Sequence, residues 1–235
     1  MVKTYIIHVS DDLIRERHIM AQLAGKGLAA TFINKGDKKD LTEQVLDTYF
    51  TGNRKNVSNS TSCVYKHILA YENIVANKDT LALVLEDDIV FYKNFKKYLP
   101  KIIAEIAKEE LAGFIVSLED SLLRYIPRSE RVRGKYLYPR SATRYAGAYL
   151  IDYQAARRIL QRIAKEKCPV PMDWYHDDCA KKGILQIFWS QPTLAIQYSH
   201  TGRMATLLDD KGSGLLRVIS FYLQWGYKRL YYFFR

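Results

Sequence analysis

The sequence has few cysteines and no long apolar run. Its 235 residues include three cysteines, Cys63, Cys168 and Cys179, too few and too scattered for a disulfide framework. Because none of them forms a CxxC pair, zinc-finger spacing is missing and we expect a reducing compartment. No uncharged stretch reaches the roughly 18 residues that a membrane-spanning helix needs. The N-terminal segment also lacks the apolar core of a signal peptide, so we expect a cytoplasmic protein.

Acidic residues are also in short supply. There are 36 Lys and Arg against 25 Asp and Glu, which gives a formal net charge of +11. Such a surplus predicts an anionic partner, which is nucleic acid, an anionic lipid surface or a phosphate-bearing ligand. Signatures of RNA-recognition modules are missing, so we expect no nucleic acid. The length and the hydrophobic fraction of 48% predict one α/β domain, alone or with a small appendage.

An acidic cluster directly follows an apolar run in the first half of the chain. Residues 81–85 are all apolar, as a buried parallel strand requires, and Glu86, Asp87 and Asp88 come next. Ligands of open α/β sheets bind just outside the carboxyl ends of strands. Carboxylates at that place suit a hard divalent cation that bridges two phosphates. A solvated loop has the same composition, so the cluster alone leaves both interpretations open.

The N-terminal segment has the pattern of a strand that leads into a basic helix. Residues 5–9 predict a buried strand, and residues 13–20 have helical spacing after an N-cap within Ser10-Asp-Asp12. Ser10 together with Arg15 and Arg17 at this helix start suits the diphosphate of a nucleotide. The alternative is that both arginines are solvated, because side chains two residues apart do not share a helix face.

Strands and helices alternate along the rest of the chain, which favours an α/β fold. We expect strands at residues 28–33, 113–118, 143–151, 183–189 and 193–197, and helices at residues 40–50, 62–76, 91–99, 101–111 and 153–165. We expect a polar loop at residues 51–61, a basic acceptor-side loop within residues 119–140 and a rigid turn at residues 169–178.

Three local features refine this outline. His67 and Tyr71 lie four residues apart on one helix face, and we expect His67 to be buried and hydrogen-bonded rather than catalytic. The small residues within 143–151 predict that the backbone approaches a ligand closely there. Asp152 is expected to be the N-cap of the helix that follows.

The C-terminal half adds candidates for catalysis. Asp173, Asp177 and Asp178 are three candidate general bases for an acceptor hydroxyl. Asp88 and a neutral imidazole such as His200 could complete the ligand shell of a manganese-type ion. That ion would act as a Lewis acid and stabilise a departing nucleoside diphosphate. His200 fits an ordinary surface residue beside Gly202 equally well.

Three ordered features make the chain resemble glycosyltransferase family 25, in particular its bacterial lipooligosaccharide galactosyltransferases. Each feature is weak alone, but the ordered set spans roughly residues 1–203 and is fairly specific. The features are IIHVSDDLIRER at residues 6–17, then SCVYKH at residues 62–67 with LVLEDDIV at residues 83–90, and finally AGAYLI at residues 146–151 with PVPMD at residues 169–173.

The resemblance implies a GT-A type fold, with a mainly parallel central sheet flanked by helices. It also implies metal-dependent, inverting transfer of a hexose from a UDP-sugar. Glu86, Asp87 and Asp88 stand where the family has its metal and nucleotide motif. Asp88 is then the first candidate ligand for Mn²⁺ or Mg²⁺, and Asp87 is the next. The family's usual Gly-Cys and Ser-His pairs are not kept at Cys63 and His67, which Ser62 and Lys66 precede.

The resemblance also bears on the candidate bases. Asp173 stands in the family's Pro-Val-Asp motif, so it is implied as an acceptor-side residue or base. An extra proline and the following His-Asp-Asp leave Asp177 and Asp178 as rivals. The family's enzymes act on lipid-linked glycans, and residues 1–207 form the expected transferase domain.

Residues 208–235 form an expected basic, aromatic tail after the linker-like Gly212-Ser-Gly214. Its amphipathic, helical character suits an anionic membrane surface. The alternative is a terminal helix that packs on the domain or on a second subunit, which leaves an oligomer possible.

We therefore expect an enzyme on the inner face of the bacterial cytoplasmic membrane. It would move a hexose, galactose in the first instance, from a UDP-sugar to a lipooligosaccharide or lipopolysaccharide core. UDP-glucose or a UDP-N-acetylhexosamine on the same fold is the alternative donor, since few pocket residues set this choice. A basic membrane-associated or nucleic-acid-binding scaffold would explain the charge and the tail, but not the acidic end of a buried strand.

Overall fold

A seven-stranded sheet forms the centre of the protein, in a computed structural model that describes residues 2–121, 124–198, 223–224, 226–227 and 230–231. The strand order is β2-β1-β3-β7-β5-β8-β6. These strands are β1 (Lys3–Ile7), β2 (Ala30–Ile33), β3 (Leu81–Glu86), β5 (Phe114–Ser117), β6 (Leu137–Arg140), β7 (Ala148–Asp152) and β8 (Gln186–Ser190). A small antiparallel sheet of β4 (Ile89–Phe91) and β9 (Ala195–Gln197) lies beyond the end of β3.

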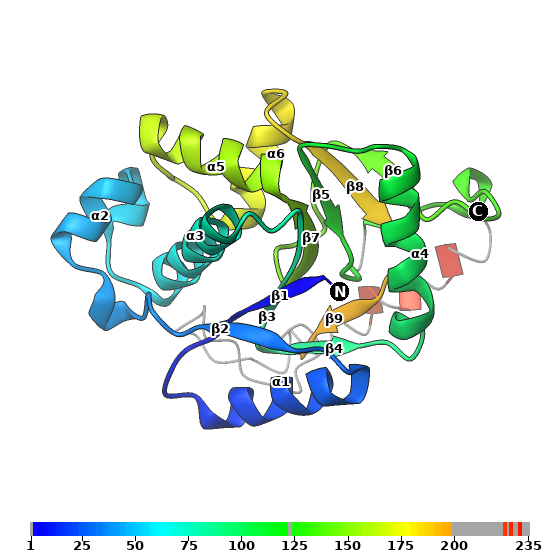
Figure 1. Ribbon diagram of the computed structural model, residues 1–235, viewed down its shortest axis with the longest axis horizontal. Helices are drawn as coiled ribbons and strands as arrows, with labels where there is room; N and C mark the ends of the chain where they lie inside the picture. The colour runs from blue at the N-terminus through cyan, green and yellow to red at the C-terminus, as the bar shows by residue number, and fades with distance from the viewer. Residues whose placement is uncertain (1, 122–123, 199–222, 225, 228–229, 232–235) are drawn as a thin grey trace.

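Helices cover both faces of the central sheet (Figure 1). They are α1 (Leu13–Lys26), α2 (Glu43–Tyr49), α3 (Asn59–Asn77), α4 (Phe95–Lys108), α5 (Tyr153–Glu166) and α6 (Met172–Lys181). Side chains alternate along each strand, so Val84 packs in one core with α3, α5 and α6, and Leu83 packs in the other with α1 and α4. The expected α/β sandwich is confirmed.

The expectation of a mainly parallel sheet is wrong, because the sheet is mixed. Within the described part of the chain, β3–β7, β5–β7 and β6–β8 are antiparallel pairs, and β1–β2, β1–β3 and β5–β8 are parallel. Every residue of β7 is buried, so its apolar run matches that of a parallel strand and gives no sign of direction. Since β7 lies between β3 and β5, the carboxyl ends of β3 and β5 meet at one edge of the sheet.

Three further expectations about elements are corrected. The rigid turn expected at residues 169–178 is largely α6, which begins directly after Pro171, where a proline fits a helix start. The two helices expected on either side of Pro100 are one helix, α4, which contains Pro100 in its interior and lacks the backbone hydrogen bond that a proline cannot donate. The short strands β4 and β6 were not expected.

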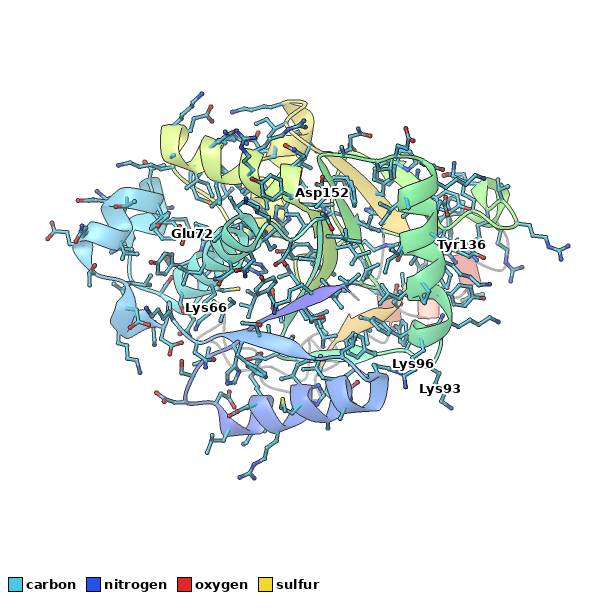
Figure 2. All side chains as sticks on the ribbon, in the orientation of Figure 1. Lys66, Glu72, Lys93, Lys96, Tyr136 and Asp152 are labelled. Atoms are coloured by element: carbon cyan, nitrogen blue, oxygen red, sulfur yellow. The ribbon has the colours of Figure 1, made fainter. Side chains whose placement is uncertain are left out.

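Both expected N-caps are confirmed. The Asp12 carboxylate accepts a hydrogen bond from Arg15 N at the start of α1 (3.0 Å). The Asp152 carboxylate accepts from Ala155 N at the start of α5 (3.0 Å), and also from Gly113 N (2.8 Å) and Phe114 N (2.9 Å). Asp152, labelled in Figure 2, therefore ties the start of α5 to the start of β5.

The predicted tail lies mostly outside the described residues, as does the predicted boundary at residue 207. Of its described residues, Tyr231 packs on Tyr227 (5.6 Å between ring centroids) and against Tyr125 (6.5 Å). The tail therefore contacts the domain at Tyr125. No helix within the described ranges is both long and apolar enough to cross a membrane.

We expect Asp152→Ala to lower the free energy of unfolding by about 2–4 kcal/mol, because the helix cap is lost and two further N–H groups lose their acceptor. Thr42→Ala is the matched control, since Thr42 caps α2 at an exposed site and should cost about 0.5–1 kcal/mol. Urea denaturation measures both. Equal losses in the two variants would contradict the role given to Asp152.

Candidate functional site

The carboxyl ends of β1, β3 and β5 bring together five ionisable residues. Glu86, Asp87 and Asp88, here called the acidic turn, join β3 to β4. His8 directly follows β1, and Glu119 lies two residues beyond β5. Asp87, Asp88 and Glu119 are each no more than 3% exposed. The structure thus concentrates carboxyl groups at one buried edge of the sheet.

Asp87 is held by two cationic or polar neighbours. Its Oδ2 lies 2.9 Å from His8 Nδ1, and its Oδ1 accepts a hydrogen bond from the Arg15 guanidinium at 2.6 Å. Burial tends to raise the pKa of Asp87, but His8 and Arg15 outweigh it and the pKa is lowered. Arg15, predicted to bind a diphosphate, therefore anchors the acidic turn. Arg17 lies on the exposed side of α1.

Unlike Asp87, Asp88 and Glu119 each have a carboxylate oxygen that nothing in the described part of the chain pairs with. Asp88 Oδ1 and Glu119 Oε1 are buried and have no hydrogen-bond partner among the described residues. Glu119 Oε2 accepts from Gly147 N at 3.0 Å. Burial, and next the charges of Glu86 and Asp88, raise the pKa of Glu119 well above its usual value. The two carboxyls are therefore close enough to interact. Their unpaired oxygens are ligands of the kind that a hard divalent cation prefers.

Glu86 points its two oxygens at different neighbours. Its Oε2 accepts from Gln197 Nε2 at 2.8 Å, and its Oε1 lies 3.6 Å from His67 Nε2. Burial raises the pKa of Glu86, although His67 opposes the shift. Gln197 reaches Glu86 by crossing Gly147, where a Cβ would lie 2.7 Å from the Gln197 side chain. The small residues within 143–151 were predicted to let a ligand approach the backbone. In the structure it is the Gln197 side chain that approaches there, at Gly147.

Asp173 lies in the first turn of α6. It is partly buried, and burial, followed by the charge of Asp177, raises its pKa. Burial and the charges of the acidic turn and Asp173 together raise the pKa of Cys63. The charges of both Asp173 and the acidic turn therefore act on Cys63.

The other two candidate bases have separate partners. Asp177 Oδ1 accepts from the backbone N (2.7 Å) and the Oγ1 (2.9 Å) of Thr143. Asp178 pairs with Arg162 of α5 and is 44% exposed at its side chain. The hydrogen bond from Arg162 lowers the pKa of Asp178. Asp177 and Asp178 are thus engaged by Thr143 and Arg162, whereas the charge of Asp173, like that of the acidic turn, acts on Cys63.

The remaining predicted residues are Ser10 and His200. Ser10 Oγ donates to Asn34 O at 2.6 Å, and Ser10 N donates to Asp37 Oδ2 at 3.4 Å. Asp37 in turn pairs at 2.8 Å with Lys66 of α3, which is labelled in Figure 2. Lys66 is 1% exposed. The unusual Lys66 therefore fixes the loop that holds Ser10. His200 lies outside the described residues.

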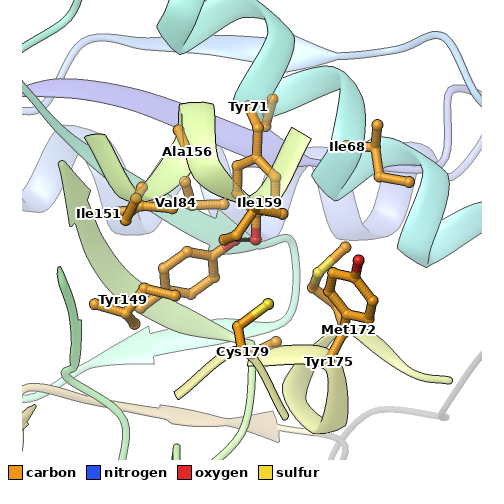
Figure 3. Packing of buried hydrophobic residues seen from close by; sticks show 14 of the residues in the cluster. Ile68, Tyr71, Val84, Tyr149, Ile151, Ala156, Ile159, Met172, Tyr175 and Cys179 are labelled. Carbon is orange, nitrogen blue, oxygen red and sulfur yellow. Dashed lines mark hydrogen bonds between the residues drawn. The ribbon is translucent and has the colours of Figure 1, made fainter. Parts of the chain in front are cut away.

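A buried chain of hydrogen bonds leads away from Glu86. His67 Nδ1 lies 2.8 Å from Tyr149 OH, Tyr149 OH lies 2.6 Å from Tyr71 OH, and Tyr71 OH lies 2.7 Å from His176 Nε2. Figure 3 shows the two tyrosines meeting between α3, β7 and α6. All four side chains are fully buried. The expectation that His67 is buried and hydrogen-bonded is confirmed.

Sequence reasoning missed His8, Glu119, Tyr149 and Gln197 at this site. His8 and Glu119 each lie at the end of an expected strand, so the rule that singled out Glu86 would also have found them. Tyr149 and Gln197 carry no local signal, because their roles depend on partners 82 and 111 residues away in sequence.

His176 predicts a pH-dependent loss of stability. Burial, with the charge of His67 as a smaller cause, lowers the pKa of His176 from 6.5 to about 3. Only the unfolded chain binds this proton as the pH falls from 6.5, so the folded state loses about 1.4 kcal/mol per pH unit. We expect His176→Gln to lack this part of the loss. Urea denaturation at several pH values below 6.5 measures the free energy of unfolding of both proteins. The same pH dependence in the wild type and in His176→Gln would refute the role given to His176.

Comparison with known proteins gives one match to a family. The family model described as "Glycosyltransferase family 25 (LPS biosynthesis protein)" matches residues 1–176, which include the acidic turn, Glu119 and Asp173. No curated protein matches the chain. Among solved structures, the crystal structure of A197 from STIV is 12% identical, with 92% of this chain and 98% of that chain covered and a TM-score of 0.48.

Proposed function

The chain belongs to glycosyltransferase family 25, and we propose that the acidic turn and Glu119 receive the diphosphate of a nucleotide-sugar donor with a divalent cation. The protein would transfer a hexose to a precursor of lipopolysaccharide. The observation that carries the proposal is the pair of buried oxygens, Asp88 Oδ1 and Glu119 Oε1, without hydrogen-bond partners in the described part of the chain. Buried carboxylates are costly unless something pairs with them, and a cation would do so.

Asp88 and Glu119 would hold the cation, and their hard oxygens suit Mn²⁺ or Mg²⁺. When bound, the cation would supply positive charge to a departing nucleoside diphosphate. Arg15 and His8 fix Asp87, so the backbone of the turn holds Asp88 in one place. His200 remains a proposed further ligand.

Asp173 is the best candidate for the general base. Its raised pKa makes it a better proton acceptor, and its charge, like that of the acidic turn, acts on Cys63. It would take the proton of an acceptor hydroxyl, whose oxygen then attacks the anomeric carbon opposite the departing nucleotide and inverts that centre. Asp177 and Asp178 are engaged by Thr143 and Arg162.

The identities of donor, acceptor and membrane contact follow from the family resemblance and from charge. We propose UDP-galactose as donor within a GT-A type arrangement, with UDP-glucose and UDP-N-acetylhexosamines as alternatives. The net charge of +11 suits a lipid-linked acceptor at an anionic membrane, where the enzyme would lie on the cytoplasmic face. An oligomer remains possible.

The cation site is tested with Asp88→Asn, which keeps the shape of the side chain. UDP with Mn²⁺ at 100 times its Kd should stabilise the wild type by about 2.7 kcal/mol, and most of this gain should be lost in the variant. A thermal-shift assay measures it, with Glu109→Gln at the exposed end of α4 as control. A full shift in Asp88→Asn would remove Asp88 from the site, and a shift with an oligonucleotide instead of UDP would favour a nucleic-acid-binding protein.

The base is tested by comparing Asp173→Asn with Asp178→Asn. Loss of a general base should lower kcat about 100- to 10,000-fold and leave the KM for the donor nearly unchanged, whereas Asp178→Asn should change kcat little. Release of UDP in the presence of a lipooligosaccharide acceptor measures both. If Asp178→Asn shows the large loss instead, the assignment of Asp173 is wrong.

A further inference from the structure

We propose that Cys63, His67 and Glu86 form a second metal site, which binds a borderline ion of the Zn²⁺ or Co²⁺ type. One potential ligand atom from each residue lies within 4.8 Å of the other two. Glu86 Oε1 lies 3.6 Å from His67 Nε2 and 4.0 Å from Cys63 Sγ. This inference goes beyond the proposed function, because it requires neither a nucleotide nor transfer.

The spacing of these atoms suits a tetrahedral ion. Zinc lies about 2.0–2.3 Å from nitrogen, oxygen and sulfur ligands, which places tetrahedral ligand atoms roughly 3.3–3.8 Å apart. The three side chains therefore need to move inward by only a fraction of an ångström to about 1 Å. Cys63 and His67 lie four residues apart on α3, so they share one helix face.

The free nitrogen of His67 points to a ligand. His67 is fully buried, and its Nε2 has no hydrogen-bond partner in the described part of the structure. Its Nδ1 is engaged by Tyr149 OH at 2.8 Å. When Nδ1–H donates to Tyr149, Tyr149 donates to Tyr71 and Tyr71 donates to His176, the Nε2 of His67 carries a lone pair. In that arrangement the outer hydrogen bond would hold the tautomer that a metal ion requires.

Glu86 is oriented in the same manner. Gln197 Nε2 holds Glu86 Oε2 at 2.8 Å, which leaves Oε1 directed toward His67 and Cys63. Gln197 reaches this place only because Gly147 has no Cβ. Two of the three ligands therefore have an outer hydrogen bond that sets their direction, as in established metal sites.

The chemistry of this site differs from that of Asp88 and Glu119. A thiol and an imidazole favour Zn²⁺ or Co²⁺, whereas two carboxylates favour Mn²⁺ or Mg²⁺. Three protein ligands leave one coordination position for water or a substrate oxygen, which distinguishes this site from closed structural zinc sites.

The test uses the full chain, freed of metal with a chelator and titrated with Co²⁺. We expect bound Co²⁺ to give a thiolate-to-cobalt charge-transfer band that is absent in Cys63→Ser and retained in Cys168→Ser. Cys168 is the matched control because it is a buried cysteine whose Sγ contacts Val170 O, outside the cluster. Competition with Zn²⁺ then gives the zinc affinity of each protein.

Tyr149→Phe keeps all three ligands and removes only the outer hydrogen bond, so we expect its Zn²⁺ affinity to fall about 10- to 100-fold. A wild-type chain without the band overturns the proposal, and so does a band that persists in Cys63→Ser. An unchanged zinc affinity in Tyr149→Phe overturns the role given to the tyrosine. Because Mn²⁺-dependent UDP binding is scored separately, failure of the proposed function leaves the cobalt signal as an independent result.

Discussion

The burial of like charges at one edge of the sheet is the constraint on which this structure depends. Asp87, Asp88, Glu119 and the more accessible Glu86 gather there because the carboxyl ends of β3 and β5, on either side of β7, lie at the same edge of the sheet. An isolated buried carboxylate is so costly that it either finds a partner or keeps its proton. Asp87 has Arg15 and His8, whereas burial raises the pKa of Glu86 and Glu119. The edge is therefore built to receive positive charge.

Much of the scaffold could be predicted because its signals are local. The apolar run before Glu86, the caps at Asp12 and Asp152, and the alternation of strands with helices are each visible within a few residues. The direction of β7 could not be predicted, because a strand buried on both faces has the same composition whichever way it runs. The antiparallel direction of β7 between β3 and β5 is what brings Glu119 to the edge at which β3 ends.

The sequence predicted the acidic residues of the candidate site, but it did not predict which residues pair with them. Glu86, Asp87 and Asp88 follow a recognisable strand, but the pairing of Asp87 with Arg15 spans 72 residues. The three aspartates after Pro171 looked equivalent because that segment was expected to be a turn. On a helix, residues 173 and 177 share a face and residue 178 does not, which explains why Asp178 turns to Arg162 on α5.

The part of the chain beyond residue 176 completes the architecture that the family match covers. It contains β8, which lies between β5 and β6 in the sheet, and β9, which carries Gln197 to Glu86. Without β8, both β5 and β6 would lose the strand with which they pair on that side. The matched stretch is thus shorter than the sheet to which it contributes, and a fragment cut at residue 176 would lack both an interior strand and the residue that orients Glu86.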